Sequence, residues 1–311
     1  MKIVNFGSCN VDYVYTLEHI VKPGETESST KMQVFAGGKG LNQSVAISRA
    51  GSRVYHVGAV GNDGYFLTKL LKESGVNVDY LKTVNEKTGH AIIQVANCGE
   101  NSIIIYSGAN SCVTKDYVDL VLNNFSKGDF VLLQNEISNV EYVVDKAFEK
   151  GMNVILNPSP INETINKIDL NKVSYLILNE TEAFEITGCQ RGEDALNYFK
   201  ENYKNLKVIL TLGKNGSVYQ DKEQTYYQAS YKVNVVDTTA AGDTFTGYFI
   251  SGIMKGFSLQ KSMNLASCAS AIAVSKNGAA PSIPTFLEVE NSIDNIPLAD
   301  SDLRAFYEKG E

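Results

Sequence analysis

The fold is decided between residues 129 and 213, where short apolar runs alternate with longer segments: DFVLLQ (129–134), MNVILN (152–157), YLILN (175–179) and KVILTLG (207–213). The segments between these runs, such as 140–150 and 193–203, carry apolar residues at helical spacing. Alternating strands and helices build right-handed βαβ units, in which helices cover both faces of a parallel sheet. The sequence therefore predicts an α/β fold with a doubly wound, mostly parallel sheet, to which residues 2–6 add a strand.

Four further strands interrupt the alternation, and we expect them at about residues 11–17, 30–36, 89–96 and 102–108. No crossover helix separates the two members of either pair. Strands inserted at two places in an α/β chain predict a small β-sheet lid on a single domain that spans residues 1–311. The alternative is an antiparallel extension of the main sheet. Residues 242–276 predict two long helices.

The composition of the chain excludes several classes of protein. The 311 residues are 43% hydrophobic and 20% charged, which is typical of a globular protein. Against 28 Lys and Arg stand 35 Asp and Glu, and the net charge of −7 argues against nucleic acid as a partner. The five cysteines form no CxxC pair, which favours a reducing compartment, the cytoplasm. The longest apolar run, 265–274, is half the length that a membrane span requires.

The strongest local signal is DTTAAGDTFTG, at residues 237–247. It follows a β-rich run, 231–236, and precedes a long helical pattern. The small residues Ala240, Ala241 and Gly242 leave backbone N–H groups unobstructed at a helix N-terminus, which is a favourable place for anionic oxygens. Asp243 in the same turn would face the bound anion. The alternative is that Asp243 only caps the helix.

Two other segments carry polar residues at element ends. In AGGKGLNQ (36–43), the glycines permit close backbone approach to a ligand, and Asn42 offers a donor and an acceptor on the first turn of a helix. In GSCNVD (7–12), Asn10 and Asp12 follow the first strand and point to one side, as a clamp for sugar hydroxyls would require. An Asx turn is the alternative interpretation of this second segment.

Taken together, the motifs closely resemble the ribokinase branch of the PfkB-type sugar kinase family. They follow one another over nearly the whole chain: GSCNVD (7–12), PGE (23–25), AGGKGLNQ (36–43), GND (61–63), GAN (108–110), NPSP (157–160), NETE (179–182), TLGKNG (211–216), DTTAAGDTFTG (237–247) and NGAAPSIP (277–284). Many relatives have Gly where this chain has Ala241, and AAGD is similar to the ribokinase subgroup. The family's fold, a doubly wound α/β domain with a small lid, agrees with the inserted strands.

The resemblance implies a kinase with Asp243 as the catalytic base. The amides of Ala240, Ala241 and Gly242 would form the anion hole for the charge that builds on the γ-phosphoryl group. The sugar site would consist of Asn10, Asp12, Gly38, Lys39, Asn42 and Glu136. The reaction implied is the ATP-dependent phosphorylation of D-ribose at O5 to give ribose 5-phosphate.

The resemblance also implies a nucleotide site and a magnesium site. ATP would contact Asn179, Thr211, Gly213, Gly216 and Ser267, with Asn277 as a further candidate. In the pattern N-x-x-E, Asn179 and Glu182 would help to hold Mg²⁺, largely through water. The alternative for Glu182 is a helix N-terminal carboxylate.

A monovalent cation, K⁺, is the third implied ligand. It would lie beside the anion hole, held mostly by backbone carbonyls at Asp237, Thr239, Ala273, Lys276, Gly278 and Ser282. Because carbonyl ligands tolerate any side chain, Lys276 does not contradict the site.

The partners expected are a sugar and ATP, with neither nucleic acid nor a membrane. An open sheet edge in a small lid also predicts a homodimer through the lid. Two alternatives to ribokinase stay open. One is another kinase of the family, such as a deoxyribokinase, fructokinase or nucleoside kinase. The other is a non-catalytic sugar-binding regulator, against which the intact Asp243 argues.

Overall fold

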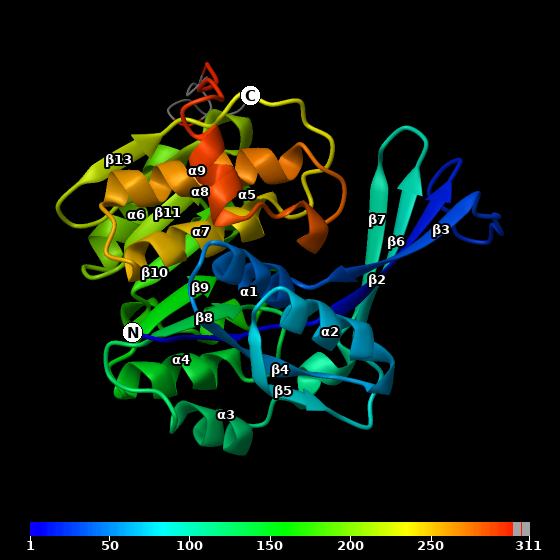
Figure 1. Cartoon of the computed structure of the whole chain (residues 1–311), viewed down its shortest axis with the longest axis horizontal. Helices are drawn as coiled ribbons and strands as arrows, with labels where there is room; N and C mark the ends of the chain where they lie inside the picture. Colours follow the sequence, from blue (N-terminus) through cyan, green and yellow to red (C-terminus); the bar gives the residue numbers. More distant parts are fainter. Residues whose placement is uncertain (301–305, 307–311) are drawn as a thin grey trace.

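The main sheet lies at the centre of the molecule (Figure 1). The computed structural model describes residues 1–300 and residue 306, and within them this sheet has nine strands in the order β13-β12-β11-β10-β9-β8-β1-β4-β5. The strands are β1 (Ile3–Phe6), β4 (Val54–Val60), β5 (Asn77–Thr83), β8 (Phe130–Gln134), β9 (Asn153–Asn157), β10 (Tyr175–Asn179), β11 (Lys207–Thr211), β12 (Ser217–Gln220) and β13 (Thr225–Gln228). Neighbours from β5 to β11 pair in parallel, whereas β12 and β13 are antiparallel.

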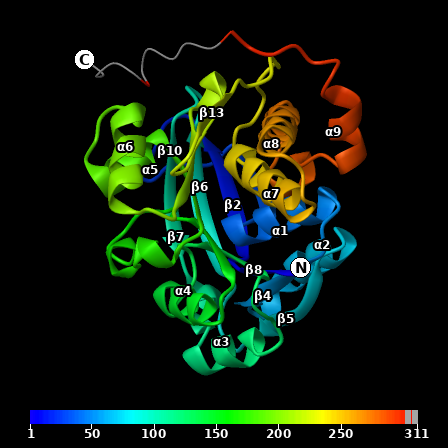
Figure 2. The ribbon, with the colours of Figure 1, turned by 90° about the vertical axis from the view of Figure 1, so that its left-hand side faces the viewer.

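Helices cover both faces of this sheet, which confirms the predicted fold class (Figure 2). One face carries α1 (Lys39–Arg49), α2 (Tyr65–Glu73), α7 (Ala241–Met254), α8 (Leu259–Val274) and α9 (Phe286–Ser292). The other face carries α3 (Lys115–Leu122), α4 (Val140–Glu149), α5 (Glu180–Thr187) and α6 (Gly192–Asn202). Among the described helices, none combines the length and apolarity that a membrane crossing requires.

Alternation along the buried strands supplies a separate core to each helical layer. Ile3 of β1 and Leu132 of β8 pack on the side of α1 and α7, whereas their neighbours Val4 and Val131 pack on the side of α3 and α4. All four side chains are fully buried. Each such burial contributes about 1.5–3 kcal/mol relative to an exposed side chain. Strands buried on both faces explain why the sequence shows apolar runs rather than alternation.

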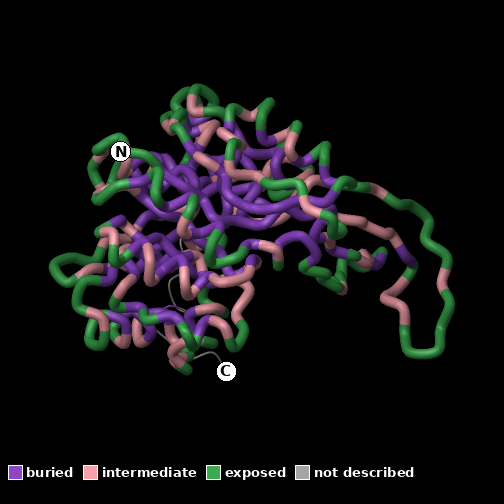
Figure 3. The backbone as a smooth tube through the Cα atoms, turned by 90° about the horizontal axis from the view of Figure 1, so that it is seen from below, coloured by how far each residue is buried: buried purple, intermediate pink, exposed green. Residues whose placement is uncertain are grey.

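Four strands form a separate lid in the order β3-β2-β6-β7. They are β2 (Asn10–Leu17), β3 (Lys31–Gly37), β6 (Gly89–Ala96) and β7 (Asn101–Tyr106). Their hydrogen bonds join them to one another and not to the main sheet, so the alternative of an extended main sheet is wrong. The lid projects from the body as an arm with largely exposed or half-buried residues (Figures 1 and 3).

Helix α1 is pressed against both the end of β1 and helix α7. A Cβ on Gly40 would lie 2.3 Å from the backbone nitrogen of Ser8, and a Cβ on Gly247 would lie 2.4 Å from the Cβ of Ala46. Neither position has room for a side chain. The two glycines therefore bring the beginning of α1 and the beginning of α7 into one region.

Polar residues end the strands on the face that α1 and α7 cover. Gln134, Asn157, Asn179 and Thr211 are the last residues of β8, β9, β10 and β11. Each lies two positions after an apolar residue that packs on this face. Because these strands are parallel, their polar ends lie along one edge of the sheet. This edge forms the floor of the candidate site.

The β-rich run at 231–236 does not form a strand in the structure. Within the described residues, Tyr231 makes only an isolated bridge. The backbone N–H groups of Val236 and Asp237 instead donate to the carbonyl of Val274, at 2.7 and 3.1 Å. Because these donors are committed to the end of α8, the segment cannot extend a sheet with them.

Candidate functional site

Asp243 lies in the first turn of α7, and its carboxylate faces α1. Its Oδ2 accepts a hydrogen bond from Nδ2 of Asn42 at 2.9 Å, and its Oδ1 accepts one from Nε2 of Gln43, also at 2.9 Å. The residue is only 7% exposed. Both of these hydrogen bonds come from the neighbouring helix, so the carboxylate is held by α1 and does not act as a cap of α7.

Burial raises the pKa of the Asp243 carboxyl, and the charge of Lys39 and the donors on Gln43 and Asn42 partly oppose this effect. A carboxylate with a raised pKa is a stronger base than an exposed aspartate. The beginning of α7 thus carries a basic oxygen in a fixed position.

Backbone donors surround this position. The N–H of Ala241 donates to the carbonyl of Thr238 at 3.1 Å, so this amide is engaged in a turn. Within the described residues, no acceptor is found for the N–H of Ala240 or of Gly242. A Cβ on Gly242 would meet no atom within 4 Å, so that position is open. Of the three amides predicted for an anion hole, two thus have no acceptor within the described residues, and of these two residues Gly242 lines the cleft, whereas Ala240 is buried.

A cleft of about 170 Å³ opens in front of Asp243. It is lined by residues from the ends of β9, β10 and β11 and from α1, α5 and α7: Lys39, Asn157, Ser159, Ile177, Leu178, Asn179, Glu182, Thr211, Thr239, Gly242, Asp243 and Thr246. Parallel α/β sheets bind ligands at this edge. The cleft joins seven of the predicted site residues: Lys39, Asn179, Glu182, Thr211, Thr239, Gly242 and Asp243.

Lys39, the first residue of α1, connects the cleft to the predicted sugar residues. Its backbone N–H donates to Oε2 of Glu136 at 2.9 Å, while its side chain lines the cleft. Burial lowers the pKa of Lys39, but the negative charges of Asp243, Glu136 and Glu182 outweigh burial and raise it. Lys39 therefore holds a permanent positive charge beside Asp243.

The predicted sugar residues lie together where the lid joins the body. Asn10 and Asp12 are in β2, and the Oδ1 of Asn10 accepts a hydrogen bond from Nδ2 of Asn110 at 2.7 Å. Glu136, just after β8, accepts a hydrogen bond from the hydroxyl of Ser8. These polar residues form a half-buried cluster beside Lys39.

Two carboxylates share this cluster. Burial, and then the negative charge of Glu136, raise the pKa of Asp12 to about 7. Burial also raises the pKa of Glu136, although the charge of Lys39 opposes it. Near neutral pH such a pair both accepts and donates hydrogen bonds, as recognition of several hydroxyl groups requires.

Asn42 and Gly38 border the same region. The Oδ1 of Asn42 is buried and receives no hydrogen bond from the described residues. A buried acceptor without a partner is costly, so this oxygen is suited to a donor on a ligand. Gly38 has φ 95°, and a Cβ there would lie 3.0 Å from the backbone nitrogen of Asn10, so the turn before α1 requires glycine.

Asn179 and Glu182 form a capping box at the start of α5. The N–H of Glu182 donates to Oδ1 of Asn179 at 2.9 Å, and the N–H of Asn179 donates to Oε2 of Glu182 at 3.0 Å. The helix-terminal role kept as an alternative for Glu182 is thus present. Among the described residues, no group of three His, Cys, Asp or Glu could hold a metal ion.

The remaining predicted nucleotide residues converge on the segment after β13. A Cβ on Gly216 would lie 2.1 Å from the carbonyl oxygen of Gln228, and the hydroxyl of Ser267 donates to the carbonyl of Ala229 at 2.9 Å. Gly213 begins the same turn, with φ 54°. These three residues do not line the cleft, whereas Thr211 does. Asn277 is exposed on the loop after α8.

Two loops meet at the predicted cation site. Oδ1 of Asp237 accepts hydrogen bonds from the N–H and the hydroxyl of Thr239, at 3.0 and 2.5 Å. Oδ2 of Asp237 accepts the N–H of Gly278 at 2.9 Å, which joins the loop before α7 to the loop after α8. Burial acts to raise the pKa of Asp237, but these donors outweigh it and lower the pKa, so the carboxylate stays charged.

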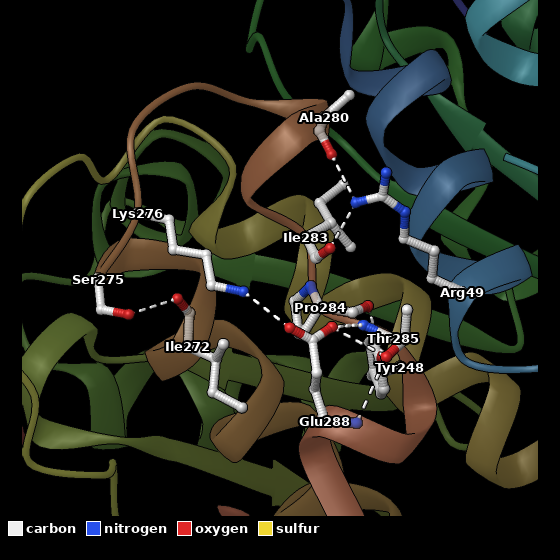
Figure 4. A network of polar contacts seen from close by, with 10 residues as sticks. All are labelled: Arg49, Tyr248, Ile272, Ser275, Lys276, Ala280, Ile283, Pro284, Thr285 and Glu288. Carbon is white, nitrogen blue, oxygen red and sulfur yellow. Dashed lines mark hydrogen bonds and ion pairs between the residues drawn. The ribbon is translucent and has the colours of Figure 1, made fainter. Parts of the chain in front are cut away.

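The loop after α8 is fastened on its other side (Figure 4). Arg49 of α1 donates to the carbonyls of Ala280 and Ile283, at 2.9 and 2.5 Å. Lys276 pairs with Glu288 of α9 at 3.1 Å, so its charged end is occupied away from the loop carbonyls. Hydrogen bonds from Thr285 and the charge of Lys276 lower the pKa of Glu288 to about 2.

Two further predicted cation residues use their polar groups within the loop. The carbonyl of Ala273 accepts the N–H of Lys276 at 3.1 Å. The hydroxyl of Ser282 donates to the carbonyl of Ala279 at 2.8 Å.

The sequence did not single out six residues that belong to the site. Gln43 contacts Asp243 directly, and five further residues line the cleft: Asn157, Ser159, Ile177, Leu178 and Thr246. Asn157 ends the apolar run 152–157 and Ser159 follows it, at the edge of the sheet where ligands bind, and both belong to the motif NPSP (157–160). Gln43 belongs to the motif AGGKGLNQ (36–43), but nothing in the sequence shows that its side chain contacts Asp243.

Known proteins resemble this chain over almost its whole length. The pattern of the pfkB family carbohydrate kinases matches residues 1–286. A ribokinase from Staphylococcus aureus (strain COL) is 36% identical over 302 residues, which cover 93% of this chain and 98% of that protein.

Two solved structures show the same fold. One is a ribokinase from Cryptococcus neoformans in complex with ADP, with a TM-score of 0.84 and 35% identity, covering 93% of this chain and 99% of the other. The second is a ribokinase from Arabidopsis thaliana complexed with ribose and ATP, with a TM-score of 0.83 and 32% identity, covering 94% and 98%.

The carboxylate pair gives a testable titration. In Glu136→Gln, the pKa of Asp12 falls below its value of about 7, because one nearby negative charge is removed. It stays above that of an exposed aspartate, because burial remains. Carbon-13 NMR of protein labelled at aspartate measures this, with the Asp12 signal identified by its loss in Asp12→Asn. An unchanged midpoint would show that the two carboxylates do not interact.

Proposed function

The chain belongs to the pfkB family of carbohydrate kinases, and we propose that it transfers the γ-phosphoryl group of ATP to O5 of D-ribose. The observation that carries the proposal is Asp243: a buried carboxylate with a raised pKa, beside two unengaged backbone amides and a cleft. Ribokinases about as long as this chain, and similar to it throughout, support ribose as the sugar.

Asp243 acts as the general base in this proposal. One of its oxygens takes the proton of the primary hydroxyl as O5 attacks the γ-phosphorus and the bond to the β-phosphate oxygen breaks. The transition state of phosphoryl transfer is loose, so positioning and electrostatics contribute most of the catalysis. The amides of Ala240 and Gly242 and the charge of Lys39 would stabilise the transferring group, and Ala241 would support the turn.

Recognition of the sugar would rest on hydrogen bonds rather than on an apolar pocket. Asn10, Asp12 and Glu136 offer acceptors and donors at the base of the lid, and the unpaired Oδ1 of Asn42 would accept from a hydroxyl. Gly38 lets the backbone approach. A site built from hydrogen bonds rejects analogues that lack a hydroxyl, because its buried groups are then left unpaired.

On the nucleotide side, ATP would extend from the cleft over Thr211 toward Gly213, Gly216 and Ser267. Asn179 and Glu182 would hold Mg²⁺ largely through water, since Mg²⁺ usually keeps several of its water ligands. When bound, Mg²⁺ neutralises phosphate charge. The chain's own contribution is the permanent charge of Lys39, which faces the same space.

A monovalent cation, K⁺, would be held by the two joined loops through oxygens of Asp237, Thr239, Ala273, Lys276, Gly278 and Ser282. The charged Asp237, which joins the two loops, supports such an ion. The ion would supply positive charge close to the turn that carries Ala240 and Gly242.

Two copies of the chain would also form a homodimer through their lids. Val34, Tyr13, Ile92 and Ile104 are paired neighbours across the four strands, on the face opposite to Asp12. Val34 is 48% exposed, Ile92 37% and Ile104 60%. An apolar row across a thin sheet is suited to a second copy of the same row.

The alternative functions of this chain predict different experimental results. A deoxyribokinase, fructokinase or nucleoside kinase would use the same base with another sugar, and a sugar-binding regulator would bind ribose without turnover. We expect the highest kcat/KM with D-ribose in a panel with 2-deoxyribose, fructose and nucleosides, measured by ADP formation.

Asp243→Asn should lower kcat at least ~100-fold, while calorimetry still detects ribose binding. Equal activity across the panel would contradict ribose, and unchanged turnover in Asp243→Asn would contradict the base.

The cation proposal predicts faster turnover in KCl than in tetramethylammonium chloride at equal ionic strength. In Asp237→Asn, the K⁺ concentration for half-maximal activation should rise roughly tenfold, because a charged oxygen is lost. Equal rates in the two salts would exclude a K⁺ requirement.

The dimer proposal predicts that Ile104→Lys shifts the protein to a monomer in sedimentation velocity, since a buried lysine would oppose association. Leu120→Lys is the matched control, because Leu120 on α3 is 58% exposed and lies away from the lid. A wild-type monomer, or a dimer that survives Ile104→Lys, would contradict an interface at this face.

A further inference from the structure

Behind Asp243, three fully buried side-chain amides form a continuous hydrogen-bonded chain. They are Asn5 of β1, Gln134 of β8 and Gln43 of α1. Nε2 of Gln134 donates to Oδ1 of Asn5 at 3.0 Å and to Oε1 of Gln43 at 2.6 Å. Nε2 of Gln43 donates to Asp243 at 2.9 Å. A polar chain thus crosses the space between the sheet and α1, where apolar side chains would otherwise pack.

One end of the chain is fixed by a backbone carbonyl. Nδ2 of Asn5 donates to the carbonyl of Gly40 at 2.8 Å and to the hydroxyl of Ser44 at 2.8 Å. A carbonyl only accepts, so the nitrogen of Asn5 must face Gly40 and its oxygen must face Gln134. Gln134 must then present its nitrogen, and Gln43 must present its oxygen to Gln134.

The other end is fixed in the same way. Nδ2 of Asn157 donates to the carbonyl of Ile177 at 2.9 Å, which leaves Oδ1 of Asn157 to accept from Nε2 of Gln43 at 3.1 Å. Both hydrogens on Nε2 of Gln43 are therefore used, one on Asn157 and one on Asp243. The two ends of the network independently require the same orientation of the Gln43 amide.

This orientation has a cost at Gln134. Both hydrogens on its nitrogen are donated, and its buried Oε1 receives no hydrogen bond from the described residues. Turning the amide over would set Oε1 against the acceptor oxygens of Asn5 and Gln43, so both hydrogen bonds would be lost and Oε1 would still have no donor. The fold keeps a buried oxygen unpaired so that Gln43 offers its nitrogen to Asp243.

We propose that Gln43 is a positioning residue for Asp243, which fixes the direction of its carboxylate and favours the ionised form, and that Gln134 prevents the Gln43 amide from turning over. This inference rests on the proposed function, in which Asp243 is the base. Lys39 from α1, Glu136 after β8 and Glu182 from α5 are the charged groups around the same region, and a substitution at Gln43 leaves all of them in place.

The test is the pH dependence of kcat in Gln43→Met, which keeps the length of the side chain and removes its donor. Loss of a hydrogen bond to the ionised form raises the pKa of Asp243, so the acidic midpoint of kcat should move up by about one pH unit. Gln134→Met should move it in the same direction by less, and it carries the test if Gln43→Met does not fold. The KM for the sugar should change little.

Gln220→Met is the matched control, because Gln220 is a buried glutamine of β12 that donates to Thr225. It removes a similar amide away from Asp243, so the midpoint should stay at the wild-type value. A folded Gln43→Met protein with the wild-type midpoint would overturn the inference, as would an equal shift in Gln220→Met.

A second measurement separates this inference from the proposed function. Carbon-13 NMR of aspartate-labelled protein gives the Asp243 titration directly, with the signal identified by its loss in Asp243→Asn, and it requires no turnover. A higher midpoint in Gln43→Met supports the inference even if the wild-type protein fails to phosphorylate ribose. An unchanged midpoint overturns it even if ribose is phosphorylated.

Discussion

Two hydrogen bonds between helices α1 and α7 hold the Asp243 carboxylate, and the rest of the site is arranged around them. Asn42 and Gln43 each bond one of its oxygens. Burial makes the group more basic, and the amides keep it in one place. An equally buried carboxylate without these hydrogen bonds would become neutral. An exposed carboxylate with the same hydrogen bonds would be a weak base. The site combines both conditions at one helix end.

This arrangement also depends on two glycines, positions where the sequence has no side chain. Gly40 lets α1 touch the end of β1, and Gly247 lets α7 touch α1. A methyl group at Gly40 would push α1 away from the end of β1, and one at Gly247 would push α7 away from α1, and either movement would strain hydrogen bonds of 2.9 Å to Asp243. The polar ends of the strands then form the floor on which both helices rest.

Much of this could be predicted from local patterns. The apolar runs determined the sheet, the unconnected strand pairs determined the lid, and the small-residue turn drew attention to Asp243. Two features could not be predicted, because each depends on contacts between segments that are distant in the sequence. The run at 231–236 has strand-forming residues, but its backbone donors bond to the end of α8. The sequence does not distinguish Gln43 and Gln134 from surface glutamines. Only the packing of α1 on the sheet shows that both are buried. The spacing of apolar residues predicts which apolar side chains are buried, but it does not predict which polar side chains are buried.

The sequence distance between the two halves of the site affects its synthesis. Asn42 and Asp243 are 201 residues apart, so a ribosome completes the first helix of the site long before the second exists. Until α7 and α8 emerge, the nascent sheet lacks the helices that cover much of one face, and its apolar side chains meet water. A chain that ends before α7 lacks Asp243 and the helices that cover this face, so we expect it to be aggregation-prone.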